Sequence, residues 1–134
     1  MTEPTSPAYA PHILLVEDEQ MIRDLIVFAL EDLGATVKAV ETADEGLAAL
    51  ELAPWSLLLT DVQTPGELDG LQLAWRAQAR APDMGLVVMS GYHGGLNAPL
   101  PEGALFLPKP WSMDQFYEVI ELQLARRAAY RPAA

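Results

Sequence analysis

The sequence of 134 residues contains no cysteine, few basic residues and no long hydrophobic segment. The absence of cysteine excludes disulfides, thiolate metal sites and thiol nucleophiles, and is compatible with a reducing compartment. Eight Lys and Arg residues stand against 19 Asp and Glu residues, and the resulting net charge of −11 would repel a nucleic-acid backbone or an anionic membrane surface. No apolar run approaches the roughly 18 residues that span a bilayer, and the N-terminus lacks the basic and apolar parts of a secretion signal. We therefore expect a cytoplasmic protein that binds neither nucleic acid nor membrane directly.

Length and composition predict one globular domain, since 51% of the residues are hydrophobic and 20% are charged. Residues 1–11 contain prolines and polar residues without periodicity, which is typical of a flexible leader. We expect the folded domain over residues 12–128 and a short tail over 129–134. The tail is too short for a further domain, and the initiator Met favours a natural gene over a piece cut from a longer protein.

Short apolar segments alternate with helical patterns along the whole chain. Apolar runs predict buried parallel strands over 12–16, 36–40, 56–60, 86–90 and 105–107. Spacings of three and four residues predict helices over 22–33, 42–52 and 71–80, and a last helix from 112. The side chains of that last helix that we expect to face inward are Met113, Phe116, Ile120 and Leu124. The alternation predicts a doubly wound α/β fold with its ligand site at the carboxyl ends of the strands.

One segment breaks this alternation. Residues 91–103 hold four glycines and two prolines, a composition that disfavours a helix. We expect the fourth helix, which would lie here, to be short, irregular or absent. We interpret His93, in the same segment, as an exposed polar residue rather than a ligand.

Reactive side chains gather at the predicted strand ends. Glu17 and Asp18 follow the first strand, Asp61 follows the third, Ser90 ends the fourth and Lys109 follows the fifth. Parallel strands bring these ends to one edge of the sheet, where close carboxylates would raise each other's pKa unless a cation lay among them. Oxygen ligands without His or Cys favour Mg²⁺. Beside such a metal, and with an ammonium and a hydroxyl aimed at the same point, a carboxylate can attack a phosphoryl group.

From about residue 12 to 127 the sequence resembles the receiver domain of two-component response regulators. The matching motifs are Ile-Leu-Leu-Val-Glu17-Asp18-Glu19, Leu-Leu-Leu-Thr-Asp61, Pro65-Gly-x-x-Asp69-Gly70-Leu71, Val-Val-Met-Ser90-Gly91 and Leu-Pro-Lys109-Pro110. The resemblance implies a flavodoxin-like, CheY-like sheet with strand order 2-1-3-4-5. The Ser90-Gly91-Tyr92 sequence and the modified fourth helix are similar to a subgroup of single-domain receivers from alphaproteobacteria.

The resemblance implies a role for each acidic residue. Asp61 would be the phosphoacceptor. Asp18, Asp61 and the backbone carbonyl of Gln63 would hold Mg²⁺, with Mn²⁺ as an alternative, and Glu17 would act through a coordinated water.

The same resemblance implies how the phosphoryl group is sensed. Ser90 would hydrogen-bond a phosphoryl oxygen and move when the group arrives, and Lys109 would pair with it. Phe106 occupies the family's aromatic switch position, although a plain core aromatic is an equal alternative. Pro110 would follow a cis peptide bond.

The loop after Asp61 departs from the family pattern. It is one residue longer before Asp69 than the commonest spacing, and Thr64 stands where a Met or Leu is usual, which predicts an altered loop geometry. We interpret Asp69 as the N-cap of the following helix rather than a catalytic group. The changed fourth helix also puts the usual partner-docking surface of the family in doubt.

The function that follows is that of a phospho-accepting signalling domain, not an enzyme beyond its own phosphorylation and dephosphorylation. Its partners would be a histidine kinase or histidine phosphotransfer protein and a downstream protein target, reached by contact or by onward phosphotransfer. We expect a monomer or weak dimer. A Mg²⁺-dependent phosphatase is disfavoured because position 63 is Gln instead of a second acid, and a non-phosphorylated pseudo-receiver because every reactive position is filled.

Overall fold

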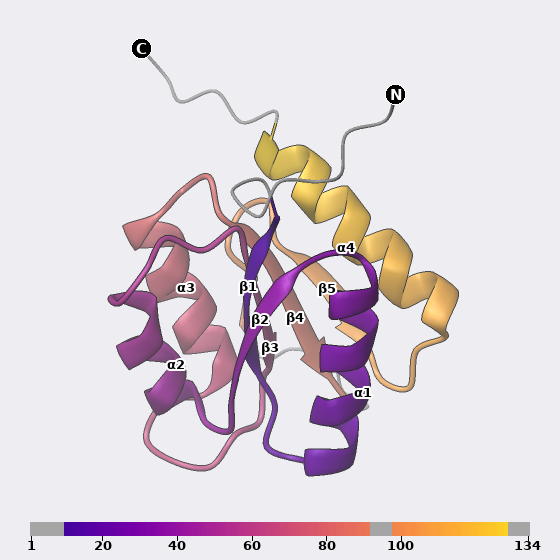
Figure 1. Ribbon diagram of the computed structural model, residues 1–134. Coiled ribbons are helices and arrows are strands. Elements are labelled where there is room, and N and C mark those ends of the chain that lie inside the picture. Colours follow the sequence, from indigo (N-terminus) through magenta and orange to yellow (C-terminus); the bar gives the residue numbers. More distant parts are fainter. Residues whose placement is uncertain (1–9, 92–97, 129–134) are drawn as a thin grey trace.

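The computed structural model describes residues 10–91 and 98–128, which alternate strands and helices (Figure 1). The elements are β1 (His12–Val16), α1 (Gln20–Asp32), β2 (Thr36–Val40), α2 (Ala43–Leu50), β3 (Leu57–Asp61), α3 (Gly70–Arg80), β4 (Gly85–Ser90), β5 (Leu105–Pro108) and α4 (Met113–Ala128). The strands form a parallel sheet in the order β2-β1-β3-β4-β5. This confirms the predicted fold class and strand order.

Two layers of helices cover the sheet, with α1 and α4 on one face and α2 and α3 on the other (Figure 1). The alternation of side chains along β1 decides which layer each residue meets. Ile13 and Leu15 pack in the core under α1 and α4, whereas Leu14 and Val16 pack in the core under α2 and α3. Both faces of the central strands are therefore apolar, which is why their sequences read as continuous hydrophobic runs.

Local signals in the sequence set most helix starts. Thr42 and Asp69 form capping boxes at the N-termini of α2 and α3, and Ser112 exchanges the same pair of hydrogen bonds with Gln115 before α4. Gly34, with φ of +90°, follows the end of α1. The interpretation of Asp69 as an N-cap is confirmed.

Two details of the predicted elements are wrong. The helix expected over 42–52 ends at Leu50, because the chain leaves the helix before Pro54. Met113 does not face the core. It is 38% exposed because it begins α4 at the rim of the layer, whereas Phe116 and Ile120 are fully buried.

The described residues on either side of 92–97 form no helix between β4 and β5, as expected for this glycine-rich segment. Side chains of α3 and α4 instead donate to its backbone carbonyls. Trp75 bonds Pro99 (3.0 Å), Gln78 bonds Glu102 (2.7 Å), and Gln123 and Arg126 both bond Gly103 (2.9 and 3.0 Å).

His93, most of the predicted leader and the predicted tail lie outside the described residues. In the part of the chain that is described, no helix combines the length and hydrophobicity needed to cross a membrane.

The first residue of α3 has no room for a side chain. A Cβ built on Gly70 would collide with the backbone oxygen of Asp61 and would lie 2.6 Å from the Thr60 hydroxyl. Backbone atoms at the end of a buried strand have little freedom to shift, so this glycine lets α3 begin directly against the strand that carries Asp61.

We predict that Gly70→Ala lowers the free energy of unfolding by about 3 kcal/mol, as overpacking against fixed atoms does, in spite of the better helix propensity of Ala. Urea denaturation followed by circular dichroism measures the change. Gly91→Ala is the control, because a Cβ there meets only ordinary contacts at 3.7 Å or more. Equal stability of the two variants would contradict the close approach.

Candidate functional site

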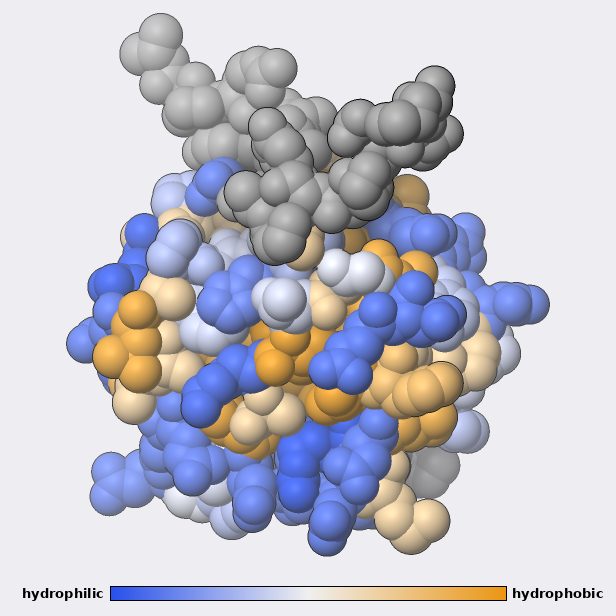
Figure 2. Space-filling view, viewed as in Figure 1, coloured by the Kyte–Doolittle hydropathy of each residue, from blue (hydrophilic) through white to orange (hydrophobic). Residues whose placement is uncertain are grey.

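Three carboxylates meet at the carboxyl edge of the sheet, at the bottom of the molecule in Figure 1. Asp61 is the last residue of β3, and Glu17 and Asp18 follow β1, its neighbour in the sheet. Each of the three offers an oxygen atom, and these atoms lie within 4.8 Å of one another. Figure 2 shows hydrophilic residues along the same lower edge. The structure thus brings together all three acids that the sequence singled out.

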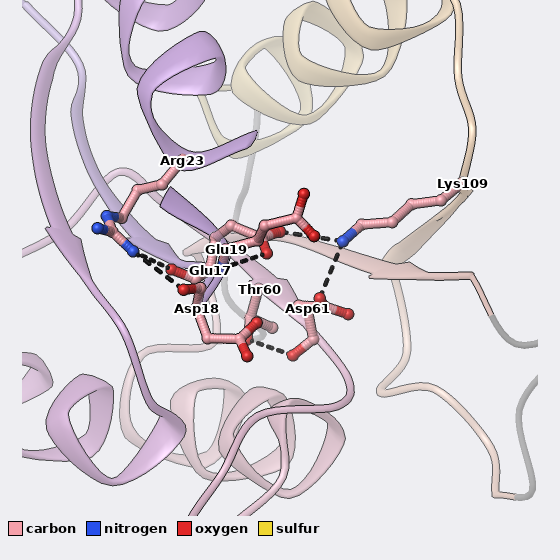
Figure 3. Close-up of polar contacts among 7 residues, drawn as sticks. All are labelled: Glu17, Asp18, Glu19, Arg23, Thr60, Asp61 and Lys109. Atoms are coloured by element: carbon pink, nitrogen blue, oxygen red, sulfur yellow. Dashed lines mark hydrogen bonds and ion pairs between the residues drawn. The ribbon is translucent and has the colours of Figure 1, made fainter. Parts of the chain in front are cut away.

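Lys109 reaches from the end of β5 to two of these acids (Figure 3). Its Nζ lies 2.9 Å from Oδ2 of Asp61 and 3.0 Å from Oε1 of Glu17, with only 18% of its side chain exposed. One ammonium therefore joins the ends of three strands.

Glu17 is 1% exposed and both of its carboxylate oxygens have partners. Oε1 accepts from Lys109, and Oε2 accepts from the backbone N–H of Glu19 at 3.1 Å. Burial raises the pKa of Glu17 above 4.5, and the hydrogen bonds from Lys109 and Glu19 offset only part of that rise.

The pKa of Lys109 reflects opposing influences. Burial by itself lowers it, but the hydrogen bonds to Asp61 and Glu17, together with their charges, outweigh burial and raise the pKa above 10.5. The side chain is therefore a cation at neutral pH.

Arg23, in the first turns of α1, supports the acidic loop and was not among the residues predicted from the sequence. Its Nη1 donates to the backbone oxygens of Glu17 (3.0 Å) and Asp18 (3.3 Å), as Figure 3 shows. These bonds fix the backbone that carries two of the three acids. The signal in the sequence is weak, because a lone Arg on a helix is most often a solvated surface residue.

A cavity of about 540 Å³ opens beside the acids. Its walls come from the loops that follow β1, β3, β4 and β5, and consist of Asp18, Asp61, Gln63, Thr64, Pro65, Gly91 and Lys109. Asp18 is exposed and Asp61 is 8% exposed, so a small charged group can reach Asp61 through this opening.

The remaining residues of the predicted site lie at the ends of β4 and β5. Ser90 is 3% exposed and pairs in register with Pro108. Phe106 is half-buried and pairs in register with Val88. The peptide bond between Lys109 and Pro110 is cis.

The donor set fits a hard divalent cation. Three carboxylates and one ammonium leave two negative charges in excess, and the cluster contains oxygen atoms but neither His nor Cys. Such a set suits Mg²⁺, which binds through one or two carboxylates and keeps several waters.

Comparison with known proteins decides the family. The family model described as the response regulator receiver domain matches residues 13–121 of this chain. The chain belongs to the response regulator receiver domain family. Receiver domains are the signalling domains of two-component systems. In this receiver the charged residues lie beside the cavity described above.

Relatives of this receiver include short and long proteins. It is 36% identical over 115 residues to the response regulator receiver protein CpdR of Brucella abortus, a match that covers 84% of this chain and 95% of CpdR. It is also 32% identical to the C4-dicarboxylate transport transcriptional regulatory protein DctD of Rhizobium meliloti, over 89% of this chain but only 25% of DctD.

Solved receivers share the fold of this one. A response regulator receiver protein from Sinorhizobium medicae superimposes with a TM-score of 0.80 at 26% identity, covering 90% of this chain and 98% of that one. The receiver domain of the hybrid histidine kinase CckA superimposes with a TM-score of 0.72 at 30% identity, covering 84% and 98%.

We predict that Lys109→Met makes the metal-free receiver less stable at pH 8 by about 2 kcal/mol, somewhat below the cost of breaking a fully buried pair. The substitution leaves the charges of Glu17 and Asp61 without a partner. The loss of stability caused by Lys109→Met should become smaller as pH falls. Burial raises the pKa of Glu17, so on acidification Glu17 takes up a proton in the folded state before it does so in the unfolded chain, and its unpaired charge disappears.

Urea denaturation in EDTA at pH 8 and at pH 5 measures this dependence. Lys38→Met is the matched control, since it removes the same charge from an exposed position on β2. A deficit that grows on acidification would contradict the electrostatic account.

Proposed function

We propose that this receiver accepts a phosphoryl group on Asp61 from a histidine kinase or a histidine phosphotransfer protein in the cytoplasm. Asp18, Asp61 and the backbone carbonyl of Gln63 would hold Mg²⁺, and Glu17 would act through a coordinated water. The observation that carries the proposal is the contact of Lys109 with Asp61 at 2.9 Å, beside two further carboxylates and an open cavity.

The chemistry is an in-line displacement. A carboxylate oxygen of Asp61 forms a bond to phosphorus while the bond between phosphorus and the donor's imidazole nitrogen breaks, and the electron pair of that bond returns to the nitrogen, which takes up a proton. Bound Mg²⁺ would supply positive charge toward the phosphoryl oxygens.

Lys109 supplies the second positive charge. In the structure it pairs with the carboxylate that reacts, so it already lies beside the position where the phosphoryl oxygens arrive. Since an ammonium has three donors, it can keep Glu17 and gain a phosphoryl oxygen as Asp61 becomes esterified.

Signalling would begin at the ends of β4 and β5. A phosphoryl group carries about two negative charges and strong acceptor oxygens, which would draw the Ser90 hydroxyl and Lys109 toward it. Phe106 lies on β5 opposite Val88 and three residues before Lys109, and its half-buried side chain would respond to this movement.

A protein phosphodonor needs a surface beside the cavity, and α1 offers one. Met21, Leu25 and Phe28 recur at helical spacing and are 82%, 51% and 72% exposed. This stripe of Met21, Leu25 and Phe28 begins three residues after Asp18. Leu25 also lines a small crevice together with Trp111 and Met113. Figure 2 shows hydrophobic residues on this face, above the hydrophilic edge. Exposed apolar residues at regular spacing favour a protein contact.

We predict that acetyl phosphate with Mg²⁺ adds one phosphoryl group to the protein, detected by intact mass and lost on treatment with hydroxylamine. Asp61→Asn should carry none, because an amide is not a nucleophile here, and EDTA should prevent the reaction in the unsubstituted chain. The absence of any adduct would contradict the proposal, and rapid turnover of unrelated phosphate esters would indicate a hydrolase.

We predict that Phe28→Ser slows phosphotransfer from a protein donor about tenfold, which corresponds to a loss of about 1.4 kcal/mol of binding, and leaves labelling by acetyl phosphate unchanged. A panel of autophosphorylated histidine kinases supplies the donor. Leu122→Ser is the control, because Leu122 is 55% exposed on α4, away from the stripe. Equal slowing by both variants would contradict docking on α1.

A further inference from the structure

The loop between β3 and α3 is fastened to the start of α2, outside the acidic cluster. The hydroxyl of Thr64 accepts a hydrogen bond from the backbone N–H of Ala43 at 3.1 Å and donates to the backbone oxygen of Leu68 at 3.4 Å. Ala43 is the first residue of α2, so its N–H has no partner within its own helix. Thr64 therefore caps a helix that begins 21 residues earlier in the chain and also spans its own loop.

Asp44 makes the second attachment. One of its carboxylate oxygens accepts from the N–H of Glu67 at 3.0 Å and the other accepts from the N–H of Leu68 at 3.1 Å. Asp44 lies in the first turn of α2, where the helix dipole stabilises a negative charge. Gly66 completes the arrangement, because its φ of +112° suits glycine and a Cβ there would meet the Asp44 carboxylate.

Backbone hydrogen bonds fix the two ends of the loop. Val62 donates to Met89 on β4 at 2.9 Å, and Gly70 donates to Val62 at 2.7 Å. Between these ends, Gln63, Thr64 and Pro65 form one wall of the cavity beside Asp61. The hydrogen bonds of Thr64 and Asp44 therefore tie this side of the cavity to the start of α2.

We propose that Thr64 and Asp44 are positioning residues that set the place of the Gln63 carbonyl and thereby the selectivity of this receiver for Mg²⁺. The inference rests on the proposed function, in which that carbonyl is a ligand. Asp44 is outside the group of acids that can meet at one ion, so its effect passes through the loop.

The size of the ion provides the discriminating measurement. Mg²⁺ requires near-octahedral geometry at about 2.0–2.1 Å, whereas Ca²⁺ accepts about 2.3–2.6 Å and irregular geometry. A loosened loop should therefore weaken Mg²⁺ binding more than Ca²⁺ binding. A general loss of stability would weaken both by the same factor.

The test measures Mg²⁺ and Ca²⁺ dissociation constants by calorimetry for Thr64→Val and Asp44→Asn. Valine keeps the shape of threonine without its hydroxyl, and asparagine loses one of two acceptors. We expect each to raise the Mg²⁺ constant about three- to tenfold and the Ca²⁺ constant less than twofold. Thr64→Ser, which keeps the hydroxyl, should restore the Mg²⁺ affinity.

Two controls separate positioning from stability and from charge. Thr42→Ala removes the other cap of α2 without touching the loop, and should lower the free energy of unfolding while leaving both metal constants unchanged. Asp32→Asn removes one exposed negative charge from α1. Hydrogen exchange of the Glu67 and Leu68 amides in metal-free protein gives a further readout. It should accelerate in Asp44→Asn but not in Asp32→Asn.

The outcomes distinguish this inference from the function on which it rests. If the unsubstituted protein bound no Mg²⁺, the proposed function would fail and the inference with it. If it bound Mg²⁺ but the Thr64 and Asp44 variants kept its affinity, or weakened both metals equally, only the inference would be overturned.

Discussion

The contact of Lys109 with Asp61 and Glu17 is the interaction on which the rest of this site depends. It joins the carboxyl ends of β1, β3 and β5 by hydrogen bonds of 2.9 and 3.0 Å, in a place where three carboxylates would otherwise repel one another. The cost of burying Glu17 is only partly offset, as its raised pKa indicates. Burial, and to a smaller extent the charge of Asp61, thus disfavour the charged form of Glu17 at this edge of the sheet, and a bound cation would offset both effects.

The fold supplies rigidity on both sides of this contact. Parallel pairing fixes where β1, β3 and β4 end relative to one another, and Gly70 lets α3 begin against the backbone of Asp61. Arg23 holds the carbonyls of Glu17 and Asp18 from α1. The backbone of each acid is thus fixed, and the buried side chains of Glu17 and Asp61, both bonded to Lys109, have little conformational freedom left to lose on binding.

The sequence predicted the sheet and the acidic cluster because both leave regular signals. Buried strands are continuous apolar runs, and the residues at their ends must share one edge once the strands are parallel. It could not predict the roles of Asp44 and Thr64, because they bond backbone groups more than 20 residues away and leave no periodicity. Arg23 bonds backbone oxygens only five and six residues away, but a lone Arg on a helix carries no signal of such a contact. Met113 was mispredicted for a related reason. Helical spacing indicates which residues share a face, but not where the neighbouring layer ends.

The charge balance of the cluster explains why a metal and a lysine would both be needed for the proposed reaction. Three carboxylates and one ammonium leave two negative charges, which one divalent cation neutralises. Esterification of Asp61 would remove one negative charge and add about two. The phosphorylated site would then carry a small excess of negative charge with the metal bound and a large excess without it. The net charge of −11 of the whole chain adds to this excess of negative charge. Mg²⁺ held by these acids would therefore supply the positive charge that lets the site accept a phosphoryl group.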